Sequence, residues 1–298
     1  MAEGVGKGGP LLQISDAGEA LMWATEVLHK AGCESFRLDA QLLLGHLLGW
    51  SRARVLAHPE RVLNPDEQAQ YRELVARRAA REPLAYIVGQ RAFWGMDFWV
   101  RPGVLIPRPE TELLVEQALA WALEQGGRDW AGTVVDVGTG SGAVIVALAR
   151  ELPRARCWGT EASEEALAVA RENLQRHGVA HRVSLVQGDL LEPLSESVEC
   201  IVSNPPYVTT AELAGLPPEI SRYEPREALD GGVDGLAVYR RLIPQAAKVL
   251  RPKGALFLEI GCGQAEAVTE ILEKNFPEGR VLRYRDLGGH WRVVTVER

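Results

Sequence analysis

The sequence predicts an α/β protein in which a seven-stranded, mainly parallel sheet follows a small N-terminal helical domain and is joined to it by a hairpin. Three observations lead to this prediction. From residue 132 onward, short apolar runs typical of strands alternate with segments of helical periodicity. Before residue 83 the periodicity is helical. Between the two regions, aromatic and polar residues alternate and glycines recur.

Composition narrows the classes of function. The chain has 298 residues, 46% of them hydrophobic, and is long enough for one large domain or for a large one plus a small one. Its 33 Lys and Arg against 40 Asp and Glu give a net charge of -7, so we expect no direct contact with nucleic acid, whose binding depends on cations that neutralise phosphates. There is no apolar run of about 20 residues. Residues 1–10 lack the apolar core of a secretion signal, so we expect a cytoplasmic protein without membrane contact.

The cysteines predict neither a disulfide framework nor a metal site. Cys33, Cys157, Cys200 and Cys262 are widely separated, and no pair has the spacing of a zinc or redox motif. We therefore expect reduced thiols and no bound metal.

The boundaries of the predicted domains follow the changes in periodicity. We predict a helical domain at residues 1–82 that serves recognition or acts as a scaffold, a linker with a β-hairpin at 83–109, and a domain of alternating strands and helices at 110–298, where we expect catalysis. Within the first domain the predicted helices are Ala17–Ala31, Arg37–Leu48 and Pro65–Arg81, with Asp16 and Asn64 as N-caps. In the linker, the alternation of Phe98 and Val100 with Trp99 and Arg101 predicts a strand. The sheet strands are predicted at Thr133–Val137, Arg156–Thr160, Val183–Gln187, Val198–Ser203, Ala255–Ile260, Val281–Arg285 and Trp291–Glu297.

A glycine-rich loop predicts a nucleotide site. The first strand runs into Asp136-Val-Gly-Thr-Gly-Ser-Gly142 and then into an apolar helix, where glycines allow a sharp turn and a close approach to a ligand. Glu161, at the end of the next strand, suits the hydroxyls of a ribose, and Asp189 suits an adenine. Gly138, Gly140 and Ala143 fit the loose dinucleotide pattern, while Asp136 also fits the amino group of S-adenosylmethionine. The loop alone does not choose between these two cofactors.

The fourth strand ends in Asn204-Pro-Pro-Tyr207, which predicts the chemistry. The Asn204 side-chain oxygen and the Pro205 carbonyl offer two acceptors for a planar NH2 group, and Tyr207 offers a flat face for stacking. A planar nitrogen is a weak nucleophile, so holding both N–H bonds aims its lone pair at a methyl donor. This tetrapeptide favours S-adenosylmethionine over a nicotinamide. The predicted catalytic residues are Asn204, Pro205 and Tyr207, and the predicted substrate-binding residues are Asn204, Pro205, Pro206 and Tyr207.

Several longer stretches of the chain closely resemble the HemK/PrmC family, the protein-(glutamine-N5) methyltransferases of peptide-chain release factors. They are Pro83–Gly89, Val104–Glu112, Tyr223–Gly232 and Leu258–Gly261, in the order usual for that family. The resemblance covers most of the chain, from the N-terminal helices to the last strand. It implies a Rossmann-like S-adenosylmethionine (SAM)-dependent methyltransferase fold, with S-adenosylhomocysteine as product. We also expect a monomer.

The same resemblance implies the substrate and the site. The substrate would be the glutamine of the Gly-Gly-Gln loop of class-1 release factors, whose methylation supports translation termination, and the N-terminal domain would contact the body of the factor. Glu161 stands where the family usually has Asp, and Leu190 stands where relatives can carry an aromatic residue. The predicted cofactor-binding residues are Asp136, Gly138, Thr139, Gly140, Ser141, Gly142, Glu161, Asp189, Leu190 and Asn204.

Three alternatives remain open from the residues themselves. An adenine-N6 methyltransferase of nucleic acid uses the same tetrapeptide, but it must hold phosphates and a flipped base, against which the net charge argues. A dinucleotide-dependent oxidoreductase would leave Asn204–Tyr207 without a role. A module that binds SAM without turnover would not need this tetrapeptide.

Overall fold

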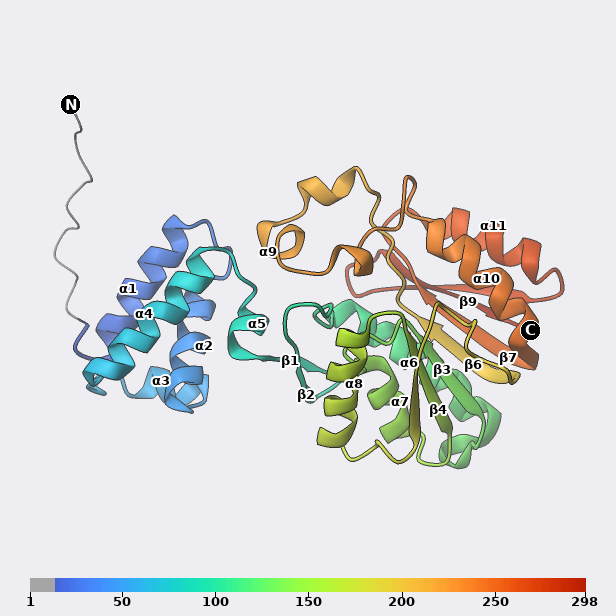
Figure 1. Cartoon of the computed structure of the whole chain (residues 1–298), viewed down its shortest axis with the longest axis horizontal. Helices are drawn as coiled ribbons and strands as arrows, with labels where there is room; N and C mark the ends of the chain where they lie inside the picture. Colours follow the sequence, from blue (N-terminus) through green and yellow to red (C-terminus); the bar gives the residue numbers. More distant parts are fainter. Residues whose placement is uncertain (1–13) are drawn as a thin grey trace. The chain divides into compact units, whose positions relative to one another are not determined.

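The computed structural model describes residues 14–298 and confirms the predicted α/β class (Figure 1). Residues 1–10, where the sequence predicts no secretion signal, lie outside the described part. The chain divides into two compact units between Val88 and Gly89. The predicted domain end at residue 82 therefore falls inside the first unit, because a short helix at Leu84–Val88 packs with the helices before it. In residues 14–298, no helix has the length and apolarity needed to cross a membrane.

The first unit is a small helical bundle. The two predicted side-chain caps are confirmed: Asp16 accepts from the Glu19 N–H, and Asn64 forms a reciprocal capping box with Glu67. Its core is apolar and includes Leu43, Leu44 and Tyr71, all fully buried. Its helices are α1 (Ala17–Lys30), α2 (Phe36–Leu48), α3 (Arg52–Ala57), α4 (Pro65–Ala79) and α5 (Leu84–Val88).

The predicted hairpin is present and opens the second unit. Strands β1 (Gln90–Phe93) and β2 (Met96–Trp99) pair antiparallel. Phe98 and Val100 are buried while Trp99 is exposed, so the alternation found in the sequence is real. Phe93 and Phe98 belong to the core of this unit, which is why the hairpin groups with it rather than standing apart as a linker.

A seven-stranded sheet forms the centre of the second unit, in the order β5-β4-β3-β6-β7-β9-β8. Strand β9 pairs antiparallel with β7 and β8 and so runs opposite to the other six strands. The predicted mainly parallel sheet is therefore confirmed. The strands are β3 (Thr133–Val137), β4 (Arg156–Glu161), β5 (Val183–Gln187), β6 (Val198–Ser203), β7 (Leu250–Glu259), β8 (Arg280–Arg285) and β9 (Trp291–Glu297). Strand β7 begins earlier than predicted, because Leu250 already pairs with Val198 across an irregular register.

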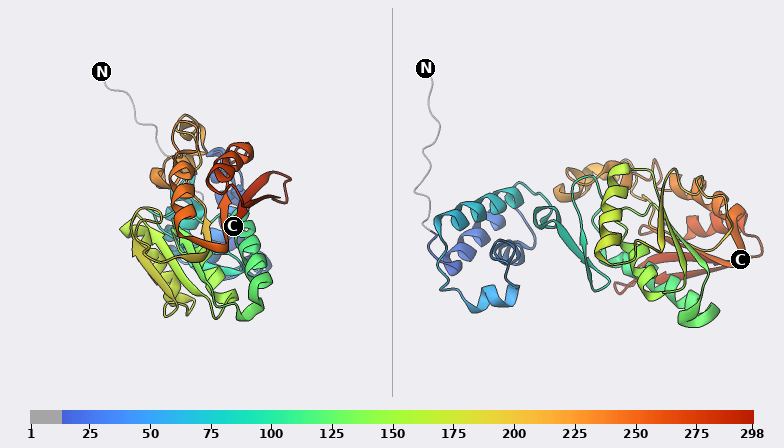
Figure 2. Two further views of the ribbon diagram at one scale, coloured as in Figure 1. Left: turned by 90° about the vertical axis from the view of Figure 1, so that its right-hand side faces the viewer. Right: turned by 60° about the horizontal axis from the view of Figure 1, so that its bottom comes forward.

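Helices cover both faces of the sheet (Figures 1 and 2). Helices α6 (Glu112–Gly126), α7 (Ala143–Glu151) and α8 (Glu164–Arg176) contribute to one apolar core, and α10 (Ala237–Val249) and α11 (Ala265–Asn275) to the other. Because helices cover both faces, the central strands β3 and β6 are almost wholly buried. The remaining helical segments are η1 (Pro109–Thr111), η2 (Gly127–Asp129), η3 (Glu212–Gly215), α9 (Pro218–Ser221) and η4 (Arg226–Ala228).

The strand order creates a switch point between β3 and β6. The chain winds from β3 to β4 and β5 on one side and then returns to place β6 on the other side of β3. In sheets of this kind, ligands bind beyond the carboxyl ends of the strands at such a point. The fold therefore predicts a site where the glycine loop after β3 meets the segment after β6.

A buried asparagine on α8 ties the hairpin to the glycine loop. The Asn173 side chain accepts from the Trp99 N–H (2.8 Å) and donates to the Trp99 carbonyl (3.0 Å) and to the Ser141 carbonyl (2.8 Å). All three partners are backbone groups, and they belong to Trp99 and Ser141, two residues that are far apart in the sequence.

We expect Asn173→Ala to lower the free energy of unfolding by about 3 kcal/mol, because three backbone groups lose their buried partner. In a unit of this size, that corresponds to a fall of roughly 6–12 °C in the unfolding midpoint, measurable by calorimetry. The matched control is Asn275→Ala, which removes a single hydrogen bond to the Ile271 carbonyl at the end of α11. Equal midpoints for the two variants would contradict this assignment.

Candidate functional site

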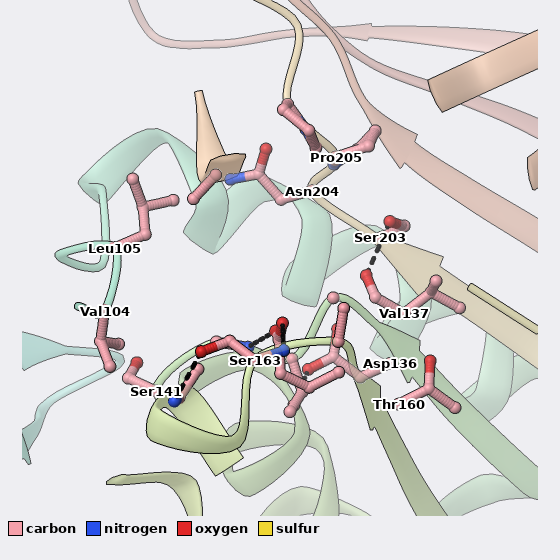
Figure 3. A pocket seen from close by; sticks show the side chains of 18 of the residues that line it. Val104, Leu105, Asp136, Val137, Ser141, Thr160, Ser163, Ser203, Asn204 and Pro205 are labelled. Carbon is pink, nitrogen blue, oxygen red and sulfur yellow. Dashed lines mark hydrogen bonds between the residues drawn. The ribbon is translucent and has the colours of Figure 1, made fainter. Parts of the chain in front are cut away.

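A cavity of about 570 Å³ lies at the carboxyl ends of β3, β4 and β6. Figure 3 shows Asn204 and Pro205 on one side of it, Ser141 and Ser163 on another, and Val104 and Leu105 on a third. All of the predicted cofactor-binding residues except Gly142 line the cavity. Gly142 instead begins α7, where a Cβ would lie 3.3 Å from the Ala170 Cβ, so its glycine lets α7 approach α8.

The loop after β3 turns on glycines in the left-handed region. Gly138 and Gly140 have φ angles of 72° and 55°. The N–H groups of Gly138 and Thr139 both donate to the Thr160 carbonyl at the end of β4 (2.8 and 3.0 Å), which anchors the turn. A Cβ at Gly138 would meet no atom within 4 Å. The loop backbone is therefore bare at a position that lines the cavity.

Asp136 is a buried acid at the floor of the cavity. It is 2% exposed, and the Thr139 hydroxyl donates to its Oδ2 at 2.6 Å. Burial raises the pKa of Asp136 to about 7, and the neighbouring charge of Glu161 adds to the rise, while the Thr139 hydrogen bond opposes it. A carboxyl in such surroundings gains most from a cation placed beside it.

Glu161 and Asp189 lie on the side of the cavity formed by β4 and β5. The two oxygens of Glu161 accept from the N–H groups of Gly140 (2.9 Å) and Ser163 (3.0 Å), so this carboxylate is fixed in place. Asp189 forms an ion pair with Arg241, a partner that the sequence did not predict. Leu190 lines the cavity in the left-handed region, with a φ angle of 51°.

The predicted tetrapeptide lies opposite the glycine loop. Asn204, Pro205 and Pro206 line the cavity, and Figure 3 shows the Asn204 side chain extending into it. Tyr207 is not among the lining residues; its ring packs against the apolar core formed with α10 and α11. Burial raises the pKa of Tyr207 to about 12. Its stacking role stays a prediction.

A second glycine-rich loop, Gly231–Gly235, packs against the backbone of the tetrapeptide. The sequence alone assigned no role to it. Gly231 donates its N–H to the Val208 carbonyl (2.7 Å), and a Cβ at Gly231 would lie 2.8 Å from the Pro206 carbonyl oxygen. The Gln264 side chain adds a bond from its Nε2 to the Tyr207 carbonyl (2.9 Å). This close packing fixes the path of the chain just after β6.

Sequence reasoning also missed an ion pair at the rim of the cavity. Glu224 is buried, and it accepts from Arg108 (2.6 Å) and from the Ile106 N–H (3.2 Å). Both acid and base fall in stretches that carried the family resemblance. The opposite charges of Arg108 and Glu224 were the only sign of this ion pair in the sequence. They do not show that two residues more than a hundred positions apart are partners.

Comparisons with known proteins found two matching family models, similar curated proteins and similar solved structures. The PrmC N-terminal domain family matches residues 19–89, and the methyltransferase small domain family matches residues 111–215. A release factor glutamine methyltransferase from Geobacter sulfurreducens is 48% identical over 257 residues, covering 86% of this chain and 88% of that protein. One from Moorella thermoacetica is 46% identical over 254 residues, covering 85% and 88%. Among solved structures, a ribosomal protein L11 methylase from Lactobacillus delbrueckii subsp. bulgaricus has a TM-score of 0.49 at 22% identity, covering 67% of this chain and 83% of that one.

The close packing of the Gly231–Gly235 loop against the tetrapeptide can be tested by adding one methyl group. A Cβ at Gly235 would lie 2.4 Å from the Tyr207 carbonyl oxygen and 2.4 Å from Gln264 Nε2. We expect Gly235→Ala to destabilise the protein by about 2–3 kcal/mol more than Gly263→Ala, through overpacking. Gly263 is the matched control, because it shares the left-handed backbone but a Cβ there would meet nothing. Thermal unfolding measures both, and similar midpoints would refute the close packing.

Proposed function

This chain belongs to the release factor glutamine methyltransferase family, and we propose that it transfers a methyl group from SAM to the side-chain amide nitrogen of the Gly-Gly-Gln glutamine in class-1 release factors. The observation that carries the proposal is the placement of Asn204 and Pro205 opposite the glycine loop, in one cavity at the β3–β6 switch point. One wall suits a nucleotide-like ligand and the other suits a planar amide.

The residues of the cavity fit SAM. Asp136 is a buried carboxyl that gains from a cation, and the amino group of SAM is one. The left-handed glycines leave the loop backbone open to a ligand, and Glu161 is held as an acceptor at the end of β4, where a ribose would lie. SAM supplies an electrophilic methyl group on a positively charged sulfur. The apolar side chains of Val104 and Leu105 help to keep water from the cavity.

The chain's own residues prepare the substrate nitrogen. Asn204 Oδ1 and the Pro205 carbonyl accept the two N–H bonds of the glutamine amide and fix its plane. With both N–H bonds held, the nitrogen carries more electron density, and its lone pair points toward the glycine-loop side of the cavity. Such positioning can lower a barrier by roughly 7–11 kcal/mol, so no strong general base is required. Once it carries the methyl group, the nitrogen is positively charged and acidic, and it releases one proton to the solvent.

The first unit serves recognition of the factor. The PrmC N-terminal domain family matches it, and it exposes apolar side chains, with Met22 at 68%. Met22, Leu21 and Phe36 are among the residues that line a groove between α1 and α2. Apolar surface of this kind suits contact with a protein body better than contact with phosphates.

The proposed function is tested by locating the methyl group. Incubation with labelled SAM and a release factor, followed by peptide mass spectrometry, is expected to place the label on the Gly-Gly-Gln glutamine. Asn204→Ala should lower the rate at least about 100-fold, by analogy with removal of one group that stabilises a transition state. Asn275→Ala, far from the cavity on α11, should leave it unchanged. Label on DNA or RNA, or full activity in Asn204→Ala, would reject the proposal.

Binding of SAM should depend on the ionisation of Asp136. Because its pKa is raised to about 7, the carboxyl gains its charge as the pH rises toward neutrality, and a cationic amino group binds only then with full strength. We expect the affinity for SAM, measured by calorimetry, to rise roughly tenfold between pH 5.5 and 7. Asp136→Asn should bind SAM more weakly and without this pH dependence. An unchanged pH profile in that variant would assign the titration to another group.

A further inference from the structure

Thr111 is a buried threonine whose hydroxyl does not cap the helix that it begins. It stands at the N-cap of α6 and is 5% exposed, yet its side chain makes no capping hydrogen bond. Instead, its Oγ1 accepts from Asn204 Nδ2 at 3.1 Å. Threonine at an N-cap usually bonds to the first turn of its own helix. Here the hydroxyl contacts the residue that binds the substrate in the proposed function.

A hydroxyl alone cannot fix which way an amide points. Asn204 has an acceptor end and a donor end, and a threonine hydroxyl can pair with either, because it both donates and accepts. If the amide turned over, its NH2 group would face the NH2 group of the substrate glutamine, and two donors would oppose each other. A further group must therefore accept the hydroxyl proton of Thr111, so that the hydroxyl oxygen is left to accept from Asn204.

Glu259 lies where it can do this. It is the last residue of β7, and its neighbour Leu258 pairs with Ser203, the residue before Asn204. Its side chain is 1% exposed, and neither carboxyl oxygen has a hydrogen-bond partner within residues 14–298. An orphaned buried carboxyl is rare in folded proteins and calls for an explanation.

The surroundings of Glu259 point to Thr111 as its partner. Burial raises the pKa of Glu259 to about 7, and the Thr111 side chain, which is near enough to act as a hydrogen-bond donor, is the group that opposes this rise most. Arg292 and Arg108 lower the same pKa from farther away, and Glu110 raises it. Both arginines are held by other acids, Arg292 by Asp286 and Arg108 by Glu224.

We propose that Thr111 and Glu259 form a positioning pair: Glu259 takes the Thr111 proton, and Thr111 must then accept from Asn204 Nδ2, which turns Asn204 Oδ1 toward the substrate amide. The inference rests on the proposed function and adds two positioning residues to it. Glu259 does not line the cavity, and Thr111 lines it but acts in this proposal through Asn204. Their effect is to preorganise the acceptor, so that no rotation of the Asn204 amide is needed when the substrate arrives.

The pair predicts a specific kinetic signature for changes at Thr111. Thr111→Val keeps the shape and removes the hydroxyl, and we expect kcat for glutamine methylation to fall tenfold or more. The KM for the release factor and the Kd for SAM should change less than about threefold. Although Thr111 lines the cavity, its hydroxyl in this proposal bonds to Asn204 and Glu259 and to neither ligand. Thr111→Ser restores the hydroxyl and should return kcat to within about threefold of the unaltered protein.

Matched variants separate positioning from folding. Thr269→Val makes the same change at a buried threonine on α11, where the hydroxyl donates only to the Ala265 carbonyl, and it should leave kcat unchanged. At the second residue, Glu259→Gln keeps an oxygen that accepts the Thr111 proton and should lower kcat only slightly. Glu259→Met cannot accept it and should resemble Thr111→Val. Calorimetric binding of SAM to each variant reports whether the site is folded.

The outcomes distinguish this inference from the function on which it rests. Failure of the unaltered protein to label the glutamine would reject both. Labelling by the unaltered protein with normal kcat in Thr111→Val would reject the positioning pair alone. Equal losses in the serine and valine variants, or a loss in Thr111→Val that appears only as weaker SAM binding, would show that Thr111 acts through packing and would likewise overturn the pair.

Discussion

The parallel pairing of β3 with β6 is the constraint on which the site depends. In this ladder Val137 lies beside Ser203, and the Ser203 hydroxyl donates to the Val137 carbonyl at 2.8 Å. This register brings the glycine loop and the Asn-Pro-Pro-Tyr segment to one edge of the sheet, although they are far apart in the chain. A slip of one residue would turn the strand's side chains to the opposite faces, so that a residue now packed in one core, such as Val202, would have to pack in the other.

Features that arise from local sequence were predicted well. Apolar strands, helix caps at Asp16 and Asn64, and the turn at Gly138 each depend on a few neighbouring residues, so composition and spacing reveal them. The order of strand and helix segments then implied the switch point and therefore the placement of Asn204. The part of the site that could be predicted is the set of residues that directly follow the carboxyl ends of the parallel strands.

Groups that depend on long-range contacts could not be predicted. Thr111 meets Asn204 across a separation of 93 residues, and Arg108 meets Glu224 across 116. A threonine before a helix has a sufficient local explanation as an N-cap, so its sequence gives no sign that the hydroxyl is used elsewhere. Glycines such as Gly235 are equally ambiguous, because a turn and a close backbone approach require the same residue. Only the packing of the folded chain decides between such alternatives.

Two buried carboxyls in and beside the site lower the stability of the folded protein. Asp136 and Glu259 each have a pKa raised to about 7 by burial, so the folded protein holds these protons more tightly than the unfolded chain does. Each therefore opposes folding increasingly as the pH rises from about 4 toward 7. An apolar residue at either position would avoid this loss. In the proposed function, Asp136 recovers this loss when the cationic amino group of SAM binds beside it. Glu259 is not a lining residue of the cavity, so its retention is explained by what its charge does to the Thr111 hydroxyl, and through it to the orientation of Asn204.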